Sequence, residues 1–221
     1  MLPLPSRLLV IALSFLGSGF VASRATAEST SSDAGTHSHD GFYLRLSIGA
    51  GAVKAKFSGS DSTPDARGSG SGAMLDVLIG GTPASGLVVG GGYQFDMAQH
   101  ADYDFGNATG SSANVARGVI GPFVEWYPDR EGGFSTGALF GPAVLTVQTP
   151  SVRILGTELG GDATGTGIGG NLWVSYTFWI ASQWSLGAEA RAGFASVKNQ
   201  DDSSQTGSGT GFALLFTSVY H

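Results

Sequence analysis

The sequence contains no cysteine, and only 13% of its 221 residues are charged. Without cysteine the chain can form neither a disulfide scaffold nor a thiolate metal site. A disordered chain would carry more charge and fewer apolar residues than the 42% present here. The net charge is −6 and the basic residues are scattered, whereas a nucleic-acid partner needs a clustered basic face. We therefore expect an ordered protein that binds no nucleic acid.

Glycine is the residue in excess, with 36 copies, more than twice the usual share of about 7%. The glycines show no three-residue period, which excludes a collagen helix. Each glycine inside an α-helix costs about 1 kcal/mol relative to alanine, which disfavours a helical bundle. Beyond residue 27 no apolar run reaches the roughly 18 residues of a membrane-spanning helix. A β protein remains.

The first residues have the parts of a secretory signal peptide. Arg7 precedes an apolar run from Leu8 to Ala22, and Ala25–Thr26–Ala27 has the small-x-small form of a cleavage site. The alternative is a membrane anchor, but the run is short against the roughly 20 residues that a span needs. We expect three segments: a signal peptide (1–27), a flexible polar segment (28–40) and a folded domain (41–221).

Apolar residues alternate with small or polar ones from residue 42 onward, which is the two-residue period of a β-strand. In the first such segment Leu44 and Leu46 share one face, and Arg45 and Ser47 share the other. Each segment is near the 9 to 11 residues that a tilted membrane strand needs. The eight expected strands are 42–53, 73–81, 87–97, 115–127, 134–147, 168–179, 184–197 and 212–220.

The expected connections alternate in length. Three are tight turns, after residues 81, 127 and 179. Four are long and rich in Gly, Ser, Thr and Asp: 55–72, 98–114, 148–165 and 198–211. This alternation is typical of an up-and-down antiparallel transmembrane β-barrel with short periplasmic turns and long extracellular loops. Pro122 and Pro142 fall on neighbouring expected strands, where each indicates a bulge or a local bend because proline cannot donate to the ladder.

Aromatic residues gather near both ends of the expected strands, as in the girdles at membrane interfaces. The alternative is that they form the core of a soluble barrel. The expected girdle residues are Phe42, Trp126, Tyr127, Phe134, Trp179, Trp184 and Tyr220 near the turns, and Tyr93 and Phe95 near the loops.

With these features, the segment from Asp40 to Gly51 resembles the first strand of the small eight-stranded outer-membrane β-barrel proteins of Gram-negative bacteria, the OmpA/OmpX-like superfamily. The resemblance covers Gly41 to His221. It implies an all-β fold, a location in the cell outer membrane and contact with outer-membrane lipids and lipopolysaccharide. It also implies insertion by the barrel-assembly machinery, and we expect a monomer.

Seven charged residues fall on the inward faces of these strands, where an eight-stranded barrel has room only for its own side chains. We expect them to form an ion-pair plug, with Arg117 bound to Asp96 and Arg45 bound to Asp76 and Glu125. The alternatives are a proton relay or a substrate site. The seven residues are Arg45, Asp76, Asp96, Arg117, Glu125, Glu189 and Arg191.

No catalytic or cofactor site is expected. His37, His39 and Asp40 are weak candidates for metal ligands, in a segment without visible rigid support. None of the four histidines falls within an expected strand, where a nucleophile and a base could be held together. The favoured hypothesis is a structural or surface-interaction barrel with a plugged lumen. The alternatives are a narrow transport or binding barrel for small apolar molecules, and a soluble exported β protein.

Overall fold

The computed structural model describes His39 and residues 41–58, 65–105, 108–149, 152–154, 157–159, 162–200 and 205–221. The expected signal peptide and all but one residue of the expected 28–40 segment lie outside them. In these described ranges, no helix is long and apolar enough to cross a membrane.

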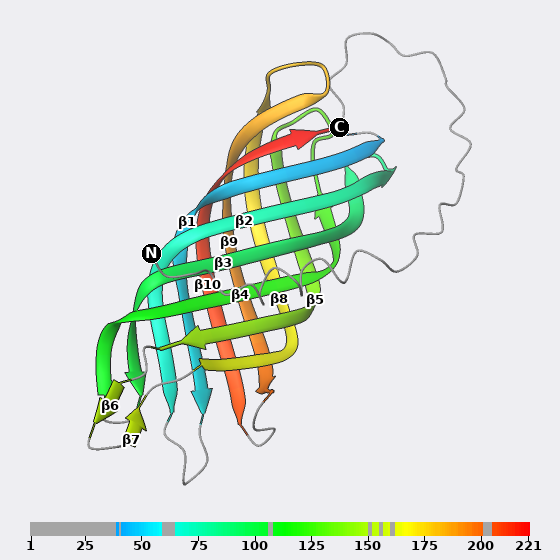
Figure 1. Cartoon of the computed structure of the whole chain (residues 1–221). Helices are drawn as coiled ribbons and strands as arrows, with labels where there is room; N and C mark the ends of the chain where they lie inside the picture. The colour runs from blue at the N-terminus through cyan, green and yellow to red at the C-terminus, as the bar shows by residue number, and fades with distance from the viewer. Residues whose placement is uncertain are drawn as a thin grey trace. The chain divides into compact units, whose positions relative to one another are not determined.

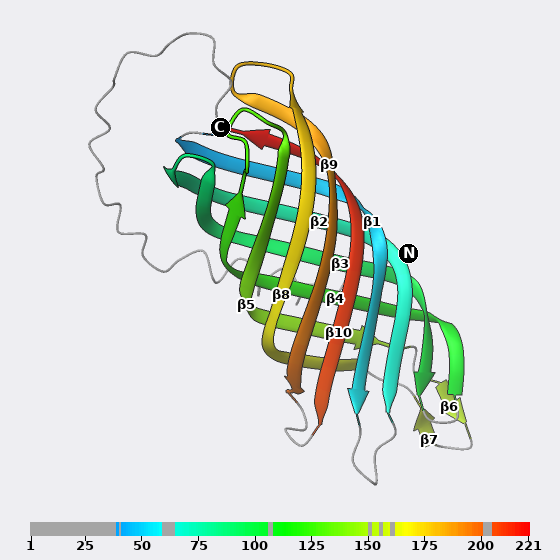
Figure 2. The same cartoon turned by 180° about the vertical axis from the view of Figure 1, so that it is seen from behind.

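Eight long strands of the described chain close into one antiparallel barrel. Each barrel strand pairs with the barrel strand before it and the one after it in the chain, and the first pairs with the last. β10 pairs with β1 over the whole length of the seam, from Leu44 opposite Tyr220 to Ser58 opposite Thr206 (Figures 1 and 2). The expected fold class is therefore confirmed. The barrel strands are β1 (Phe42–Ser58), β2 (Ala66–Ala84), β3 (Leu87–Phe105), β4 (Ala108–Trp126), β5 (Phe134–Gln148), β8 (Asp162–Trp179), β9 (Trp184–Asn199) and β10 (Thr206–Tyr220).

Two short strands, β6 (Val152–Ile154) and β7 (Thr157–Leu159), form a separate hairpin between β5 and β8. This hairpin lies at the end of the barrel where β1 ends and β2 begins (Figure 1). The tight turns after β2, β4 and β8 lie at the other end, as the sequence predicts.

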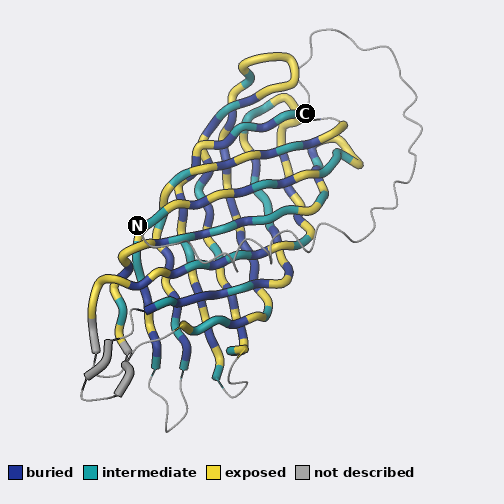
Figure 3. The backbone as a smooth tube through the Cα atoms, viewed as in Figure 1, coloured by how far each residue is buried: buried dark blue, intermediate teal, exposed yellow. Residues whose placement is uncertain are grey.

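Burial alternates residue by residue along the strands (Figure 3). On β1, Ile48 is 63% exposed, whereas the neighbouring Ser47 is 2% exposed and faces the lumen. Many large apolar residues of the barrel are exposed and seven charged residues are buried, which is the reverse of a soluble protein. A lipid-facing surface explains this inversion, because an apolar outer face is stable only out of water.

The outward faces change from apolar to polar at one position on each barrel strand, toward the long connections. On β1 the apolar stretch runs from Phe42 to Ala52, which matches a tilted membrane strand of 9 to 11 residues. The last apolar and first polar outward residues are Ala52 and Lys54, Ala73 and Ser71, Met97 and Gln99, Ala116 and Asn114, Val144 and Thr146, Ile168 and Thr166, Phe194 and Ser196, and Phe212 and Thr210. The barrel wall therefore carries a continuous apolar band.

The prediction of four long loops is wrong in extent. β1 continues to Ser58 and β2 begins at Ala66, and β3 and β4 leave only residues 106 and 107 between them. The strands therefore continue beyond the apolar band through segments of loop-like composition. Once two strands are in register, small polar residues extend the ladder in water because their backbone groups remain paired.

The two prolines interrupt the ladder between β4 and β5. Pairing is recorded from Asn114 to Val119 and again from Phe123 to Trp126, with no pair between these stretches among the described residues. The register is the same on both sides, so the interruption contains no inserted residue. Of the two expected alternatives, a bulge or a local bend, the bulge is therefore wrong at this seam. Pro122 and Pro142 each lack an N–H, and two donors are missing from the seam.

Candidate functional site in the lumen

All seven charged residues expected in the lumen lie there and are at most 3% exposed. They come from five of the eight barrel strands, one each from β1, β2 and β3 and two each from β4 and β9, with each side chain on an inward-facing position. Burial in a narrow barrel removes these groups from water, so each charge needs a partner inside the lumen. The structure arranges them in two clusters.

The Arg45 cluster consists of Arg45, Glu125 and Glu189. The guanidinium of Arg45 lies 2.8 Å from Glu125 Oε1 and 3.1 Å from Glu189 Oε2. Arg45 also donates a hydrogen bond of 2.7 Å to the hydroxyl of Ser175. The hydroxyl of Tyr43 donates to the second oxygen of Glu125 at 2.5 Å. One cation thus binds two carboxylates from different walls of the barrel.

The Arg191 cluster consists of Arg191, Arg117, Asp76 and Asp96. Arg191 forms ion pairs with both Asp76 and Asp96, and Arg117 pairs with Asp96. The Nε of Arg117 donates to Asp96 Oδ2 at 2.6 Å. Two guanidiniums and two carboxylates therefore alternate across the lumen.

The expected pairing of Arg45 with Asp76 is wrong. Arg45 binds Glu189 on β9, and Asp76 binds Arg191 on the same strand. The expected pair lies on adjacent strands, β1 and β2, whereas the expected pair of Arg45 with Glu125 on β4 is present. In a narrow barrel, however, a long side chain reaches across the axis to a strand that is not adjacent in the ladder.

Sequence reasoning missed the uncharged members of both clusters, although the alternation places each of them on an inward face. Glycine also shapes the Arg191 cluster. A Cβ on Gly193 would clash with the guanidinium of Arg117 and the side-chain oxygen of Asn171, so the missing side chain leaves space for both groups. The uncharged polar partners are Tyr43, Ser135 and Ser175 around Arg45, and Gln94 and Asn171 around Arg191.

Toward the long connections the lumen becomes apolar. Inward-facing residues from several strands pack together there as part of a buried hydrophobic cluster that also reaches the end with the tight turns. Phe57 is 2% exposed, and Leu145 is fully buried. This packing fills the lumen beyond the ion pairs. Its members include Val53, Ala55, Phe57, Val115, Leu145, Val147 and Val197.

The end with the tight turns is filled by two histidines, which we call the histidine pair: His39 and His221. Nε2 of His39 donates to the carbonyl of Gly132 at 2.9 Å, and its Nδ1 then accepts from Nε2 of His221 at 2.9 Å. The ring of His39 stacks on Tyr127 at 3.7 Å between centroids, and Trp179 lies 5.0 Å away. The pair joins the segment before β1 to the residue after β10.

These positions correct two expectations and leave a third untested. His39 is fully buried and held by hydrogen bonds, so the expected flexibility of segment 28–40 does not hold at this residue. His37 and Asp40, the other weak candidates for metal ligands, lie outside the described residues. Tyr127 is 2% exposed and, like Trp179, packs against the histidine pair. Alternation directs both rings inward, so neither belongs to the girdle.

Other expected girdle residues lie on the outer wall. Phe42 and Trp126 are more than half exposed, and Phe134 is nearly so. Trp184 contacts Tyr220 at 5.2 Å between ring centroids, and Tyr93 stacks with Phe95. The barrel has an apolar band outside, charges inside and eight antiparallel strands in a closed ring. These three features together are typical of a transmembrane β-barrel. The chain has the fold of a small outer-membrane β-barrel.

Solved structures show a similarity in fold to this chain. The outer membrane protein OprG from Pseudomonas aeruginosa is 13% identical, with a TM-score of 0.47, over 84% of this chain and 99% of OprG. The attachment invasion locus protein Ail of Yersinia pestis is 10% identical, with a TM-score of 0.42, over 80% of this chain and 99% of Ail. The outer membrane protease OmpT from Escherichia coli is 9% identical, with a TM-score of 0.43, over 82% of this chain and 97% of OmpT.

No protein-family model matches the sequence. No curated protein matches it either.

Replacing Arg45 by methionine should destabilise the barrel by about 3 to 5 kcal/mol, because Glu125 and Glu189 would remain buried without their cation. The measurement is the urea midpoint of the protein folded in lipid vesicles. Arg130→Met is the matched control, since the side chain of Arg130 is 62% exposed and its loss should change stability little. Equal midpoints for the two variants would contradict the structural role of Arg45.

Acidification should weaken the histidine pair. Burial, followed by the charges of His39 and Arg45, lowers the pKa of His221 to about 3. The unfolded histidine titrates near 6.5, so the stability from neutral His221 is complete above this pH and is lost as pH falls toward 3. Between pH 7 and 5 we expect His221→Gln to remove about 2 kcal/mol of pH dependence from unfolding in urea. His100→Gln, at an exposed position on β3, should retain it.

Proposed function

We propose that this protein is an integral, non-catalytic barrel of the cell outer membrane whose function depends on its outer surface and loops. The observation that supports this is the filling of the lumen along its length. The histidine pair fills one end, the two ion-pair clusters occupy the middle, and apolar residues such as Phe57 and Leu145 fill the other end. A solute would have to displace all three layers to pass.

The orientation follows the usual arrangement of such barrels, with the tight turns in the periplasm and the β6–β7 hairpin outside. The strands that extend beyond the apolar band then project from the cell surface, where they can contact other molecules. Insertion as a monomer by the barrel-assembly machinery belongs to the same proposal, since one chain closes its own ladder.

Planar-bilayer recordings should show no large, stable conductance for the purified protein. The reason is that opening the lumen requires breaking buried ion pairs and leaving charges without partners. A general porin in the same bilayer is the positive control, and heat-dependent gel migration verifies that the barrel is folded. A reproducible open channel from the folded protein would refute the closed lumen.

A second candidate function is the passage of small apolar molecules through the side of the barrel. It is favoured by the interrupted β4–β5 ladder, beside which the lumen residues are apolar. Val119, Phe123 and Leu139 face the lumen there and are at most 4% exposed. Opening at this seam would break fewer backbone hydrogen bonds than opening at a complete ladder.

The second candidate is tested by uptake of an apolar dye into liposomes containing the protein. If passage occurs at the seam, replacing Pro122 and Pro142 together by valine should slow uptake severalfold, because two backbone donors are restored. Pro128→Val, in the exposed turn after β4, is the control and should leave uptake unchanged. Uptake no faster than in empty liposomes would eliminate this function.

A further inference from the structure

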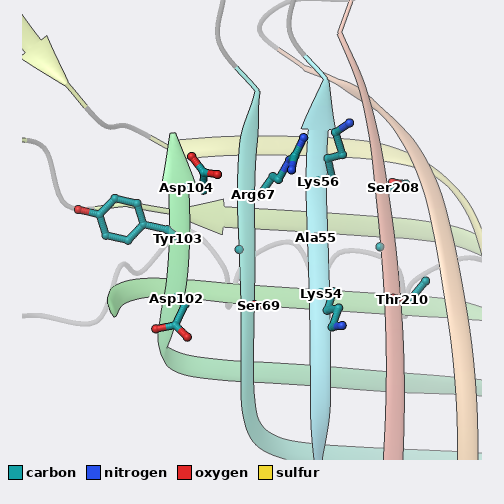
Figure 4. Close-up of a pocket in the computed structure, with 12 residues that line it drawn as sticks. Lys54, Ala55, Lys56, Arg67, Ser69, Asp102, Tyr103, Asp104, Ser208 and Thr210 are labelled. Carbon is teal, nitrogen blue, oxygen red and sulfur yellow. The ribbon is translucent and has the colours of Figure 1, made fainter. Parts of the chain in front are cut away.

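The charges of the outer wall are balanced near the long connections. In and beside the cleft that Figure 4 shows, three cations are matched by three carboxylates. Asp65 lies 3.2 Å from both Lys56 and Arg67, and these side chains are partly exposed, so water screens them. The balanced set is Lys54, Lys56, Arg67, Asp65, Asp102 and Asp104.

The charges of the lumen are not balanced. The Arg191 cluster contains two guanidiniums and two carboxyls, so it is neutral when all four groups are ionised. The Arg45 cluster contains one guanidinium and two carboxyls, so it has one negative charge in excess. The histidine pair adds no cation at Nδ1 of His39, which accepts a hydrogen bond. An uncompensated charge at this depth is costly, so the lumen must hold one further positive charge.

The hydrogen bonds show which carboxyl is in excess. Both oxygens of Asp76, of Asp96 and of Glu125 accept hydrogen bonds from donors. Oε2 of Glu189 accepts from Arg45 at 3.1 Å. Oε1 of Glu189 is buried and accepts from no donor among the described residues. The oxygen without a donor therefore belongs to the cluster with the excess negative charge.

The strands around Glu189 supply no second cation to Oε1. In the ladder Glu189 lies opposite Ser175 on β8 and opposite Leu215 on β10, and neither residue is charged. On its own strand Arg191 is held by Asp76 and Asp96. The charged groups that face Glu189 from the other strands are Arg45 on β1, Asp76 on β2 and Glu125 on β4.

One of these facing groups, Asp76, is within hydrogen-bonding reach of Glu189. Two carboxylates in contact repel each other, whereas a carboxylic acid donates its proton to a carboxylate in a strong hydrogen bond. Asp76 already accepts from Arg191 and Gln94, which suits the ionised form. Glu189, with an oxygen that receives no donor, suits the protonated form.

We propose that Glu189 is a proton-binding site of the folded barrel, where Oε1 carries a proton at neutral pH and donates it to Asp76. The proton neutralises the excess charge, so that three arginines are matched by three carboxylates. In the unfolded chain glutamate titrates near about pH 4.3, so folding at neutral pH takes up one proton from water. The site does not depend on the orientation of the barrel or on the function of its outer surface.

Infrared spectroscopy of the folded protein at pH 7, in a detergent without carbonyl groups, tests the proton directly. The stretching band of a protonated carboxylic acid should be present in the unaltered protein and absent from Glu189→Gln. Glu131→Gln is the matched control and should retain the band, because the side chain of Glu131 is 58% exposed and ionised in water. Absence of the band from the unaltered protein would overturn the proposal.

Stability separates a protonated Glu189 from an ionised one. Glu189→Gln should leave the urea midpoint at pH 7 unchanged or raise it, because an amide accepts from Arg45 and donates to Asp76 as the acid does. The same substitution at Glu125 should increase the unfolding constant about a hundredfold or more, because Arg45 then loses its carboxylate. Equal destabilisation by the two substitutions would mean that Glu189 is ionised.

The pH dependence counts the proton. The folded protein binds one proton more than the unfolded chain at Glu189, so a rise in pH favours unfolding. Between pH 6 and 7 the unfolding constant of the unaltered protein should rise about tenfold relative to that of Glu189→Gln. A ratio of the two constants that stays the same over this interval would contradict proton uptake at this residue.

A bound sodium ion is the other means of neutralising the excess charge. Replacing sodium chloride by choline chloride at equal ionic strength should leave the stability of the unaltered protein unchanged. A loss of stability in choline chloride that is absent from Glu189→Gln would mean that sodium occupies the place of the proton, and it would overturn the proposal.

Discussion

The structure depends on one constraint: backbone N–H and C=O groups in lipid must pair within the protein. A row of strands satisfies this only if its two edges meet, and the pairing of β1 with β10 closes the ladder here. Closure fixes which face of every strand contacts lipid. The apolar band, the buried charges and the narrow lumen all follow from it. The β4–β5 seam, where two prolines remove donors, is a local departure from complete pairing.

Charges in so narrow a lumen need partners because little space remains for water. Eight strands bring opposite walls within reach of one side chain, so Arg45 on β1 binds carboxylates on β4 and β9. Glycines at inward positions such as Gly193 leave space for the guanidiniums. The lumen is thus filled by side chains whose size and charge are matched across the axis. Because the lumen is filled, the outer surface is the part of the barrel that remains for contacts with lipid and with other molecules.

Much of the fold could be predicted from the sequence. A strand has a period of two, so the identity of Ile48 as lipid-facing and of Asp76 as inward follows from counting alone. Strand ends were harder to predict. Outside the membrane, glycine and serine occur equally well in loops and in paired strands. Whether such a segment becomes a loop or a strand depends on whether a neighbouring strand pairs with it. The extension of β1 and β2 into the expected loop is the clearest case.

The sequence by itself determined the class of fold, the direction of each barrel side chain and the set of lumen charges, because these depend only on alternation along a strand. Tertiary structure decided the partners. Closure of the ring placed Glu189 beside Arg45, and it brought His39 from before β1 against His221 from after β10. No periodicity encodes such contacts, since they depend on the distance across a barrel that exists only when all eight strands have paired.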